Sequence, residues 1–440
     1  MSKPVLAIVG RPNVGKSTLF NKIVGRRISI VEDTPGVTRD RIYADAEWLR
    51  HKFTVIDTGG LDPDSDDVII KQIYRQAEVA MEAADVILLV VDVKAGPLDA
   101  DKDAANILRK TKKPVLLVVN KVDDMRKENL DFYEFYSLGL GEPIAVSSGQ
   151  GLGIGDLLDE IAKRFPEPDE EAEIPDAIRV AVTGKPNVGK SSLINKVLGK
   201  ERLIVSDIPG TTRDSVDSLI ERGGQKYVFV DTAGLRRKSK IKEKIERYAI
   251  VRAVSSIDRS DVSVLLIDAE QGVSEQDSKI AGIAHDHGRA SIVAVNKWDK
   301  IEKDNKTMDK FTKDISVELA FMAYAPKIFI SALTGQRIDK LFELIQSVYQ
   351  NHNLRISTGM LNDVLIEAMA VNQPPADRGK QLKIYYATQA SVRPPKFVLF
   401  VNNSELMHYS YLRYIENQLR QSFGFSGTPL QFILRDKNLS

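Results

Sequence analysis

Cysteine is absent from the 440 residues of this chain, and long apolar runs are absent as well. Without cysteine the chain can form no disulfide framework, no thiol nucleophile and no cysteine-ligated zinc site. The longest apolar runs, such as Val86 to Val91, fall far short of the roughly 20 residues that a membrane-spanning helix needs. The opening MSKPVLAIVG turns polar too soon for a signal peptide. We therefore expect a cytoplasmic protein with no membrane span.

An excess of charge of one sign is also missing, because 62 basic residues are balanced by 61 acidic ones. The net charge of +1 predicts no overall attraction to nucleic acid, so charge has to be considered region by region. With 43% hydrophobic and 28% charged residues, the composition is that of a globular protein. At roughly 150 residues per domain, the length predicts about three domains.

What the chain does contain is one series of motifs twice. GRPNVGKSTLFNKIVG begins at Gly10, and GKPNVGKSSLINKVLG begins 174 residues later at Gly184. TPGVTRD and IPGTTRD, and then DTGGL and DTAGL, repeat at the same spacing. A repeat of this length indicates a duplicated domain and not a solenoid.

The segment between the copies is acidic and rich in proline. PEPDEEAEIPDA, residues 166–177, holds six acids, no base and three prolines, which is typical of an extended linker. The alternative is that this acidic segment attracts a basic binding partner. We predict a first domain over 1–165, this linker over 166–177, a second domain over 178–352 and a third over 353–440.

Within each copy, short apolar runs alternate with helical stretches. In the first copy the pattern predicts helices near 68–83, 100–110 and 153–164. The strands are predicted at Val5–Val9, Phe53–Asp57, Val86–Asp92, Val115–Asn120 and Ile144–Val146. Continuously apolar runs suit parallel strands buried on both faces, so the pattern predicts a doubly wound, mostly parallel α/β sheet in each copy.

The third domain has no counterpart in the repeat. We predict helices near 358–370 and 408–422, with strands near 380–389, 396–402 and 429–435, which together make a small α+β domain. Its ten basic and six acidic residues give a charge of +4. RNA binding is one reading of such a domain, although many small basic domains bind no RNA.

A phosphate-binding loop opens each copy. Gly10 to Ser17 and Gly184 to Ser191 fit G-x-x-x-x-G-K-S, between an apolar strand and a helical run. The glycines allow backbone N–H groups to surround phosphates, the lysine reaches the β and γ oxygens, and the serine hydroxyl suits Mg²⁺. Each copy is therefore expected to bind a nucleoside triphosphate.

Guanine is the base that the next motif selects. Asn120-Lys121-x-Asp123 and Asn296-Lys297-x-Asp299 each end an apolar strand. The aspartate can accept from the two guanine donors, which adenine lacks. The lysine stem would cover the base, and the asparagine would tie this loop to the phosphate loop. Ser147-Ser148 and Ser331-Ala332 would place backbone N–H groups near the base oxygen.

Two further motifs suit a nucleotide-dependent switch. Asp57 and Asp231 begin D-T-x-G sequences, in which the aspartate would support Mg²⁺ and the N–H of Gly60 or Gly234 would meet the γ-phosphate. Thr38 and Thr212 suit mobile loops that complete the Mg²⁺ site only when the γ-phosphate is present.

The residues that we expect to contact nucleotide are Gly10, Asn13, Gly15, Lys16, Ser17, Thr18, Asp57, Asn120, Lys121, Asp123, Ser147, Ser148, Gly184, Asn187, Gly189, Lys190, Ser191, Ser192, Asp231, Asn296, Lys297, Asp299, Ser331 and Ala332. The expected catalytic residues are Lys16, Thr38, Gly60, Lys190, Thr212 and Gly234. The expected Mg²⁺ ligands are Ser17, Thr38, Ser191 and Thr212.

With these motifs the chain resembles the EngA/Der family of bacterial GTPases over its whole length. The resemblance implies a KH-like third domain, binding of GTP or GDP with Mg²⁺, hydrolysis of GTP, and a role in maturation of the large (50S) ribosomal subunit, with its rRNA as partner. We expect a monomer. The third domain departs from a typical KH pattern, because its one G-x-x-G, Gly424 to Gly427, lies between a helix and a strand. We interpret it as a turn.

The position that orients the attacking water departs from Ras-like enzymes. Leu61 and Leu235 stand where such enzymes carry glutamine, which predicts slow hydrolysis by the chain alone. Asn13 and Asn187 match an asparagine that supports a K⁺ ion in related enzymes, so we predict activation by potassium. The alternative is that asparagine merely suits the loop backbone.

The stretches that follow the two D-x-x-G motifs differ in charge. Arg236 to Arg247 has seven bases and two acids, whereas Asp62 to Asp67 is acidic. The basic stretch is either a nucleotide-gated surface for RNA or for the third domain, or a solvated helix start. Two other functional classes are alternatives: a nucleotide-dependent metabolic enzyme such as a kinase, and a GTP-binding scaffold that does not hydrolyse GTP. The sequence supplies no domain for the acceptor substrate that a kinase needs.

Overall fold

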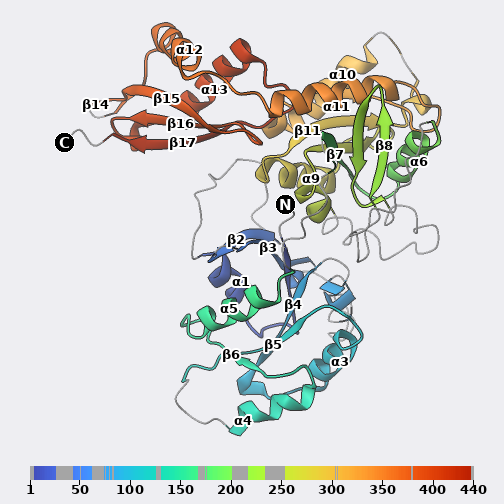
Figure 1. Cartoon of the computed structure of the whole chain (residues 1–440), viewed down its shortest axis with the longest axis vertical. Coiled ribbons are helices and arrows are strands. Elements are labelled where there is room, and N and C mark those ends of the chain that lie inside the picture. Colours follow the sequence, from blue (N-terminus) through green and yellow to red (C-terminus); the bar gives the residue numbers. More distant parts are fainter. Residues whose placement is uncertain are drawn as a thin grey trace. The chain divides into compact units, whose positions relative to one another are not determined.

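The computed structural model divides the chain into two compact units, Met1–Ala172 and Glu173–Ser440 (Figure 1). It describes residues 4–25, 43–49, 51–61, 74, 76–78, 80–81, 84–124, 130–166, 174, 176–200, 217–232, 253–302, 304, 306–377 and 380–437.

The first unit is built on a six-stranded sheet in the order β2-β3-β1-β4-β5-β6. Only β2 runs antiparallel to its neighbour among these pairings, and the others are parallel. The strands are β1 (Val5–Val9), β2 (Tyr43–Trp48), β3 (His51–Asp57), β4 (Val86–Asp92), β5 (Val115–Asn120) and β6 (Ile144–Ala145). Every residue of β1 and β4 is buried, as parallel strands covered on both faces require.

Helices cover both faces of this sheet. The helical elements are α1 (Lys16–Val24), η1 (Thr58–Leu61), η2 (Val93–Ala95), α3 (Asp99–Leu108), α4 (Leu130–Tyr133), η3 (Glu134–Leu138) and α5 (Ile154–Arg164). Apolar side chains of α1 and α5, such as Leu19 and Ile161, pack in one core with strand residues such as Leu88. Figure 1 shows α3 on the opposite side of β4.

The second unit begins with a sheet of the same design, in the order β12-β11-β10-β7-β9-β8. Its strands are β7 (Ala177–Thr183), β8 (Ser218–Arg222), β9 (Gln225–Phe229), β10 (Val262–Asp268), β11 (Ala290–Asn296) and β12 (Lys327–Phe329). Its helical elements are α6 (Lys190–Lys200), α9 (Glu275–Asp286), η4 (Trp298–Lys300), α10 (Thr307–Glu318), η5 (Ala320–Met322) and α11 (Ile338–His352). Here β8 is the antiparallel strand. The repeat in the sequence is therefore a repeat of the whole fold.

The C-terminal part of the second unit, α12 to β17, is a three-stranded sheet backed by two helices. Its elements are α12 (Thr358–Val371), β13 (Ala376–Asp377), β14 (Lys380–Gln381), β15 (Ile384–Ser391), β16 (Lys396–Val401), η6 (Ser404–Leu406), α13 (Tyr409–Phe423) and β17 (Gln431–Asp436). Figure 1 shows α12 and α13 on one side of the sheet. Leu361, Ile415 and Leu399 share the core between the helices and that sheet face.

This C-terminal part is docked on the second six-stranded sheet and its helices. The backbone N–H of Gly427 donates to the carbonyl of Tyr324 across 2.8 Å, and the N–H of Ser291 donates to the carbonyl of Gly427 across 2.7 Å. The side-chain amide of Asn351 donates to the carbonyl of Ser426. The loop after α13 is thus fixed by backbone hydrogen bonds.

The predicted fold class is confirmed. In the first copy the edge strand β6 was predicted, whereas the edge strand β2 was missed. β2 and its counterpart β8 are antiparallel and partly exposed, so they lack the continuous apolar run by which the buried strands were found. The strand predicted near 380–389 is divided into β14 and β15. The side chain of Asn402 binds the carbonyl of Gln381 and the N–H of Lys383 where the two strands meet. In the part of the chain that is described, no helix is long and apolar enough to cross a membrane.

Candidate functional site

The first phosphate loop connects β1 to α1 and is shaped by two glycines. Gly10 has a φ angle of 154° and Gly15 one of 93°. A Cβ atom on Gly10 would collide with the carbonyl of Val90, and one on Gly15 would collide with the side-chain amide of Asn120. The loop can adopt this conformation only when both positions lack a side chain. The backbone between the two glycines then forms a concave phosphate-binding loop, which we call the glycine cradle.

The second phosphate loop has the same construction. Gly184 and Gly189 have φ angles of 130° and 102°. A Cβ atom on either would collide with the carbonyl of Leu266 or the side-chain amide of Asn296, respectively. In both copies, the asparagine of the base-binding motif therefore occupies the space that the second glycine leaves open.

The lysine of the first loop turns back into the loop. Lys16 Nζ donates to the carbonyls of Gly10 and Arg11, both at 2.8 Å. Burial lowers the pKa of Lys16 to about 8, and the nearby Asp57 carboxylate only partly opposes this shift. Such a lysine gains most from a polyanion, because phosphate oxygens would restore the solvation that burial removes.

The second lysine repeats this arrangement. Lys190 Nζ donates to the carbonyls of Gly184 and Lys185, both at 2.6 Å. In both copies the lysine ammonium group therefore bonds to backbone carbonyls of its own phosphate loop.

A hydroxyl and a carboxylate meet beside the first loop. Ser17 Oγ donates to Asp57 Oδ2 across 2.8 Å, and Asp57 Oδ1 accepts the N–H of Gly59 across 2.9 Å. Oxygen donors of this kind suit Mg²⁺ that also binds nucleotide phosphates. In the second copy, the backbone N–H of Asp231 donates to Asp217, whose carboxylate also accepts from Arg259 at 2.7 Å.

Some of the expected switch residues are not covered by the structure. Thr38, Thr212, Gly234 and Leu235 lie outside the described residues, as do the stretches 62–67 and 236–247. Gly60 and Leu61 are placed as backbone in η1. Their expected roles remain predictions.

The asparagines of the base-binding motif join three loops. Asn120 Nδ2 donates to the carbonyl of Val14 across 2.8 Å, and this is the tie that the sequence predicted. Asn120 Oδ1 accepts the N–H and hydroxyl of Ser148 at 3.0 and 2.9 Å. The Ser148 N–H, which we expected near the base oxygen, thus holds the asparagine in this structure.

The second copy has the same three-way junction. Asn296 Nδ2 donates to the carbonyl of Val188 across 2.7 Å, and Asn296 Oδ1 accepts the N–H of Ala332 across 2.8 Å. The buried Ser331 hydroxyl accepts the N–H of Thr334. Both junctions place the base-binding loops directly beside the phosphate loops.

The lysines of the motif are held by carboxylates that the sequence analysis missed. Lys121 Nζ lies 2.6 Å from Asp92 Oδ2 and donates to the carbonyl of Asn13. Lys297 Nζ lies 2.5 Å from Asp268 Oδ2. Asp92 and Asp268 end β4 and β10, and their separation of 176 residues equals that of the two motifs, a signal that could have identified them.

The aspartates expected to read guanine lie at the surface. Asp123 accepts from Lys94 Nζ at 3.0 Å and from Ser147 Oγ at 2.8 Å, and these two hydrogen bonds lower the pKa of Asp123. It therefore remains an anion, the form that accepts both guanine donors. Asp299 is exposed in η4, beside the buried Trp298.

A second pair of buried carboxylates forms ion pairs with basic residues of the phosphate loops. Asp101 and Asp277 lie in the first turns of α3 and α9 and are almost fully buried. Arg11 Nε lies 3.3 Å from Asp101 Oδ2, and Lys185 Nζ lies 3.6 Å from Asp277 Oδ2. The residue that follows the first glycine of each phosphate loop, Arg11 or Lys185, is thus paired with a buried aspartate in both copies.

The residues proposed for potassium adopt an unusual backbone conformation. Asn13 and Asn187 have φ angles of 65° and 63°, and both side chains are exposed. Asparagine tolerates this left-handed region better than most residues. The conformation therefore supplies a backbone reason for asparagine that is independent of any ion.

Two doubly wound sheets, each with a glycine cradle, a lysine turned back into its loop and an asparagine junction, define a tandem P-loop GTPase. Residues 5–121 and 179–297 match the family described as "50S ribosome-binding GTPase", and residues 355–435 match "KH-domain-like of EngA bacterial GTPase enzymes, C-terminal". Residues 246–351 also match "Elongation factor Tu GTP binding domain".

Full-length relatives give the family itself. The chain is 63% identical over 437 residues to GTPase Der of Acetivibrio thermocellus and 59% identical over 437 residues to that of Alkaliphilus oremlandii, with 99% of each chain covered. The chain belongs to the GTPase Der (EngA) family. Among solved structures, the FeoB G-domain from Methanococcus jannaschii is 27% identical, with 37% of this chain and 98% of that chain covered and a TM-score of 0.28.

Proposed function

We propose that this GTPase acts in assembly or maturation of the large (50S) ribosomal subunit and that its nucleotide state sets its affinity for ribosomal RNA. The observation that carries the proposal is the pairing of two independently built nucleotide sites with a small basic KH-like domain in one chain. The family description of a 50S ribosome-binding GTPase supports it. The protein would work in the cytoplasm, as a monomer.

Each site would bind GTP or GDP with the residues that form its cradle. Lys16 and Lys190 would leave the loop carbonyls to bind phosphate oxygens, and Ser17 and Ser191 would contribute hydroxyls to Mg²⁺. A bound Mg²⁺ would supply positive charge to the phosphates. Thr38 and Thr212 would complete the Mg²⁺ site when the γ-phosphate is present. The backbone N–H groups of Gly60 and Gly234 would donate to the γ-phosphate.

Guanine recognition would depend on the two base-binding motifs. Asp123 and Asp299 would accept the two guanine donors, while Lys121 and Lys297 would lie along the base. Adenine has neither of these donors, so the Asp123 carboxylate would be left with unmet hydrogen bonds, and a loss of this kind discriminates strongly.

We also propose that potassium stimulates hydrolysis through Asn13 and Asn187. Leu61 and Leu235 cannot orient water by hydrogen bonding, so an added positive charge near the phosphates would compensate in part. Phosphate release measured in KCl and in NaCl tests this, and it also distinguishes a hydrolysing enzyme from a GTP-binding scaffold.

Charge segregation supports an RNA partner. Residues 178–350 carry 29 bases and 23 acids, and the C-terminal part adds a charge of +4, whereas residues 1–165 carry 23 bases and 26 acids. Lysine and arginine facing RNA release counterions, so the affinity should fall steeply with salt. The stretch Arg236 to Arg247 would connect this charge to nucleotide state.

Co-sedimentation of the full chain with purified large subunits tests the proposal. Binding should be tighter with a non-hydrolysable GTP analogue than with GDP, and it should weaken along a KCl series. Replacing Arg236, Arg237 and Lys238 by Ala should reduce the nucleotide difference more than it reduces GTP hydrolysis. The matched control replaces three exposed lysines at the start of α10, namely Lys306, Lys310 and Lys313. Binding that ignores both salt and nucleotide would refute the proposal.

A further inference from the structure

The G-x-x-G loop of the KH-like part is occupied by contacts within this unit. Phe425 is fully buried, and the backbone of Gly427 is bonded on both sides to the GTPase sheet and its loops. A Cβ atom on Gly427 would collide with the side chain of Val348 in α11. A nucleic acid could reach this loop only if the C-terminal part left its dock, so an RNA contact has to be sought elsewhere.

The sheet of the C-terminal part has one docked end and one open end. The β15–β16 hairpin reaches the GTPase part, where Arg393 Nη2 donates to the Tyr349 hydroxyl at 2.7 Å and Pro394 lies against Gly288. At the opposite end, β15 begins beside the last residues of β16 and β17. We call this opposite end the distal surface; it comprises residues 380–386, 400–403 and 435–437.

Aromatic rings lie side by side on the distal surface. Tyr386 pairs with Phe400 across β15 and β16, and their rings stack with centroids 4.3 Å apart and an angle of 13°. Ala387 and Leu399, the next residues along, point into the core under the helices, so Tyr386 and Phe400 belong to the uncovered sheet face. Tyr386 keeps 39% of its surface exposed, which leaves ring area for a further stacking partner.

Basic residues share the distal surface with these rings. Lys437 Nζ lies 5.2 Å from the ring centroid of Tyr385 and 5.9 Å from that of Tyr386, and Arg435 is the neighbour of Phe400 in β17. Lys380 and Lys383 are exposed at the start of β14 and just before β15. The distal surface therefore holds four cations, and one of them, Lys437, lies over the tyrosine rings.

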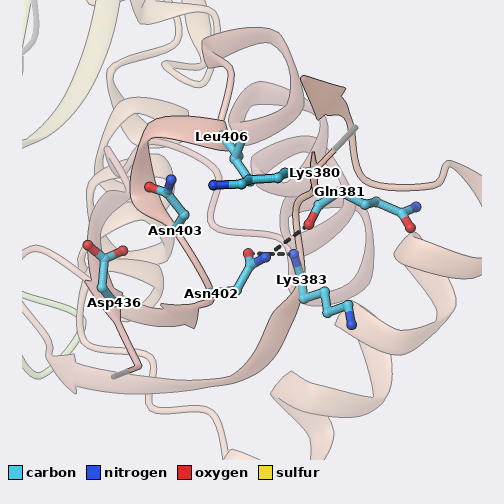
Figure 2. A pocket seen from close by; sticks show the side chains of 7 residues that line it. All are labelled: Lys380, Gln381, Lys383, Asn402, Asn403, Leu406 and Asp436. Atoms are coloured by element: carbon cyan, nitrogen blue, oxygen red, sulfur yellow. Dashed lines mark hydrogen bonds between the residues drawn. The ribbon is translucent and has the colours of Figure 1, made fainter. Parts of the chain in front are cut away.

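The distal surface also has a polar hollow. It encloses about 440 Å³ and is lined by Lys380, Gln381, Lys383, Asn402, Asn403, Leu406 and Asp436 (Figure 2). The acid that lines it, Asp436, is engaged by the N–H and hydroxyl of Ser404 at 2.6 and 3.2 Å. Its charge is therefore partly satisfied within the protein, and the lysines dominate the rim.

We infer that the distal surface binds single-stranded RNA, with a base stacked on Tyr386 and the backbone phosphates along Lys380, Lys383 and Lys437. This inference rests on the proposed function and names the surface that would contact the RNA. Exposed rings beside lysines suit single strands, because only an unpaired base offers its face for stacking. The faces of bases in a duplex are already stacked and would meet only the lysines.

The test measures RNA affinity of the full chain by fluorescence anisotropy. The probe is a labelled single-stranded RNA of about 12 nucleotides, compared with the same strand annealed to its complement. Tyr386→Ala should weaken single-strand binding about tenfold, within the range for loss of one stacked base, and should change duplex binding little. Tyr386→Phe should bind like the wild type.

Tyr409→Ala is the matched control, because Tyr409 is 44% exposed on α13 and has Arg413 over its ring at 5.4 Å. It should leave single-strand affinity unchanged. Lys380→Ala combined with Lys437→Ala should reduce the salt dependence of binding even if the tyrosine variant fails to fold. GTP hydrolysis by each variant reports whether the chain is intact.

The outcomes separate the two proposals. If the wild type binds large subunits and the Tyr386→Ala and lysine variants bind single-stranded RNA as tightly as it does, this inference is wrong and the proposed function stands. If Tyr386→Ala weakens binding to subunits but not to free RNA, the surface contacts a protein and the inference is also wrong. If the wild type binds single-stranded RNA through Tyr386 but ignores large subunits, only the proposed function fails.

Discussion

The ammonium group of Lys121 lies 2.6 Å from the carboxylate of Asp92, so the residue that ends β4 holds the lysine of the base-binding motif. Lys297 and Asp268 repeat the pair at 2.5 Å at the end of β10. Both lysines have positive φ angles, 66° and 63°, which orient their side chains back across the loop. The carboxylates act through the lysines and are positioning residues.

Asp268→Asn should weaken GDP binding at the second site by about tenfold, because a charge-assisted hydrogen bond contributes about 1.5–3 kcal/mol. The amide keeps the acceptor that Asp268 Oδ1 offers to the N–H of Glu270, so the loop should stay folded. Fluorescent GDP titrated into a Lys16→Ala background isolates the second site. Glu270→Gln, which removes only an exposed ion pair with Lys300, is the control and should have no effect.

Asp123→Asn and Asp299→Asn should each weaken GTP binding and favour xanthosine triphosphate. The amide can donate to the oxygen that xanthine carries in place of the guanine amine, whereas it cannot accept both guanine donors. Competition between the two nucleotides in equilibrium binding measures the switch. Equal loss of both nucleotides in a folded variant would contradict the assignment.

Asn13→Gly and Asn187→Gly distinguish the two explanations of these asparagines. Glycine accepts the observed φ angles of 65° and 63° without strain, so these variants remove the carboxamide and keep the loop conformation. If the carboxamide supports potassium, the excess of the hydrolysis rate in KCl over that in NaCl should disappear while GDP binding stays near normal. A full KCl effect in both variants would favour the backbone explanation.

Gly427→Ala should destabilise the second unit by about 2 kcal/mol or more, because a φ angle of 79° strains alanine and the new Cβ would strike Val348. Thermal unfolding measures the loss. Adding Val348→Ala should recover part of the lost stability, because it removes the side chain that the new Cβ would strike. Gly223→Ala is the control: Gly223 also has a positive φ angle but open space around it, so this variant should lose only the stability that backbone strain costs. A loss at Gly427 no larger than that at Gly223 would refute the collision.

Stability of the docked C-terminal part should fall as the pH is lowered. Burial, with Arg420 and Arg413 nearby, lowers the pKa of His285 to about 4, and burial with Arg289 and Arg393 lowers the pKa of His352 to about 3. The unfolded chain, with a histidine pKa of about 6.5, binds more protons below that pH, so the free energy of unfolding falls from about pH 6.5 toward pH 4.

The expected loss is about 1–2 kcal/mol per histidine between pH 7 and pH 5. His352 Nδ1 lies 2.6 Å from the Thr428 hydroxyl. In His352→Gln the glutamine amide can still hydrogen-bond to Thr428, but it does not titrate between pH 7 and pH 5. The difference in melting temperature between wild type and variant should therefore shrink as the pH falls. His408→Gln, at an exposed position, should track the wild type at every pH. A constant difference for His352→Gln would contradict the argument.

The sequence by itself determined the duplicated α/β fold and the two sets of motifs that we propose to bind nucleotide. Buried parallel strands such as β4 need continuous apolar residues, and a phosphate loop needs glycine at Gly10 and Gly15, so both leave a local signal in the sequence. The tie from Asn120 to the phosphate loop was also predicted. It joins the carboxyl ends of β5 and β1, which lie at one edge of the sheet on either side of β4.

Only the tertiary structure revealed the partners that lie far away in the chain. Asp92 and Asp101 look like ordinary acids near a strand end and a helix start, and their roles appear when the fold brings them to Lys121 and Arg11. The edge strand β2 is partly exposed and has only one buried residue, so it carries no continuous apolar signal. Burial of the G-x-x-G loop and the Tyr386–Phe400 stack depend on docking and strand register, because the distances between such residues are set by packing across the fold and not by neighbours in the chain.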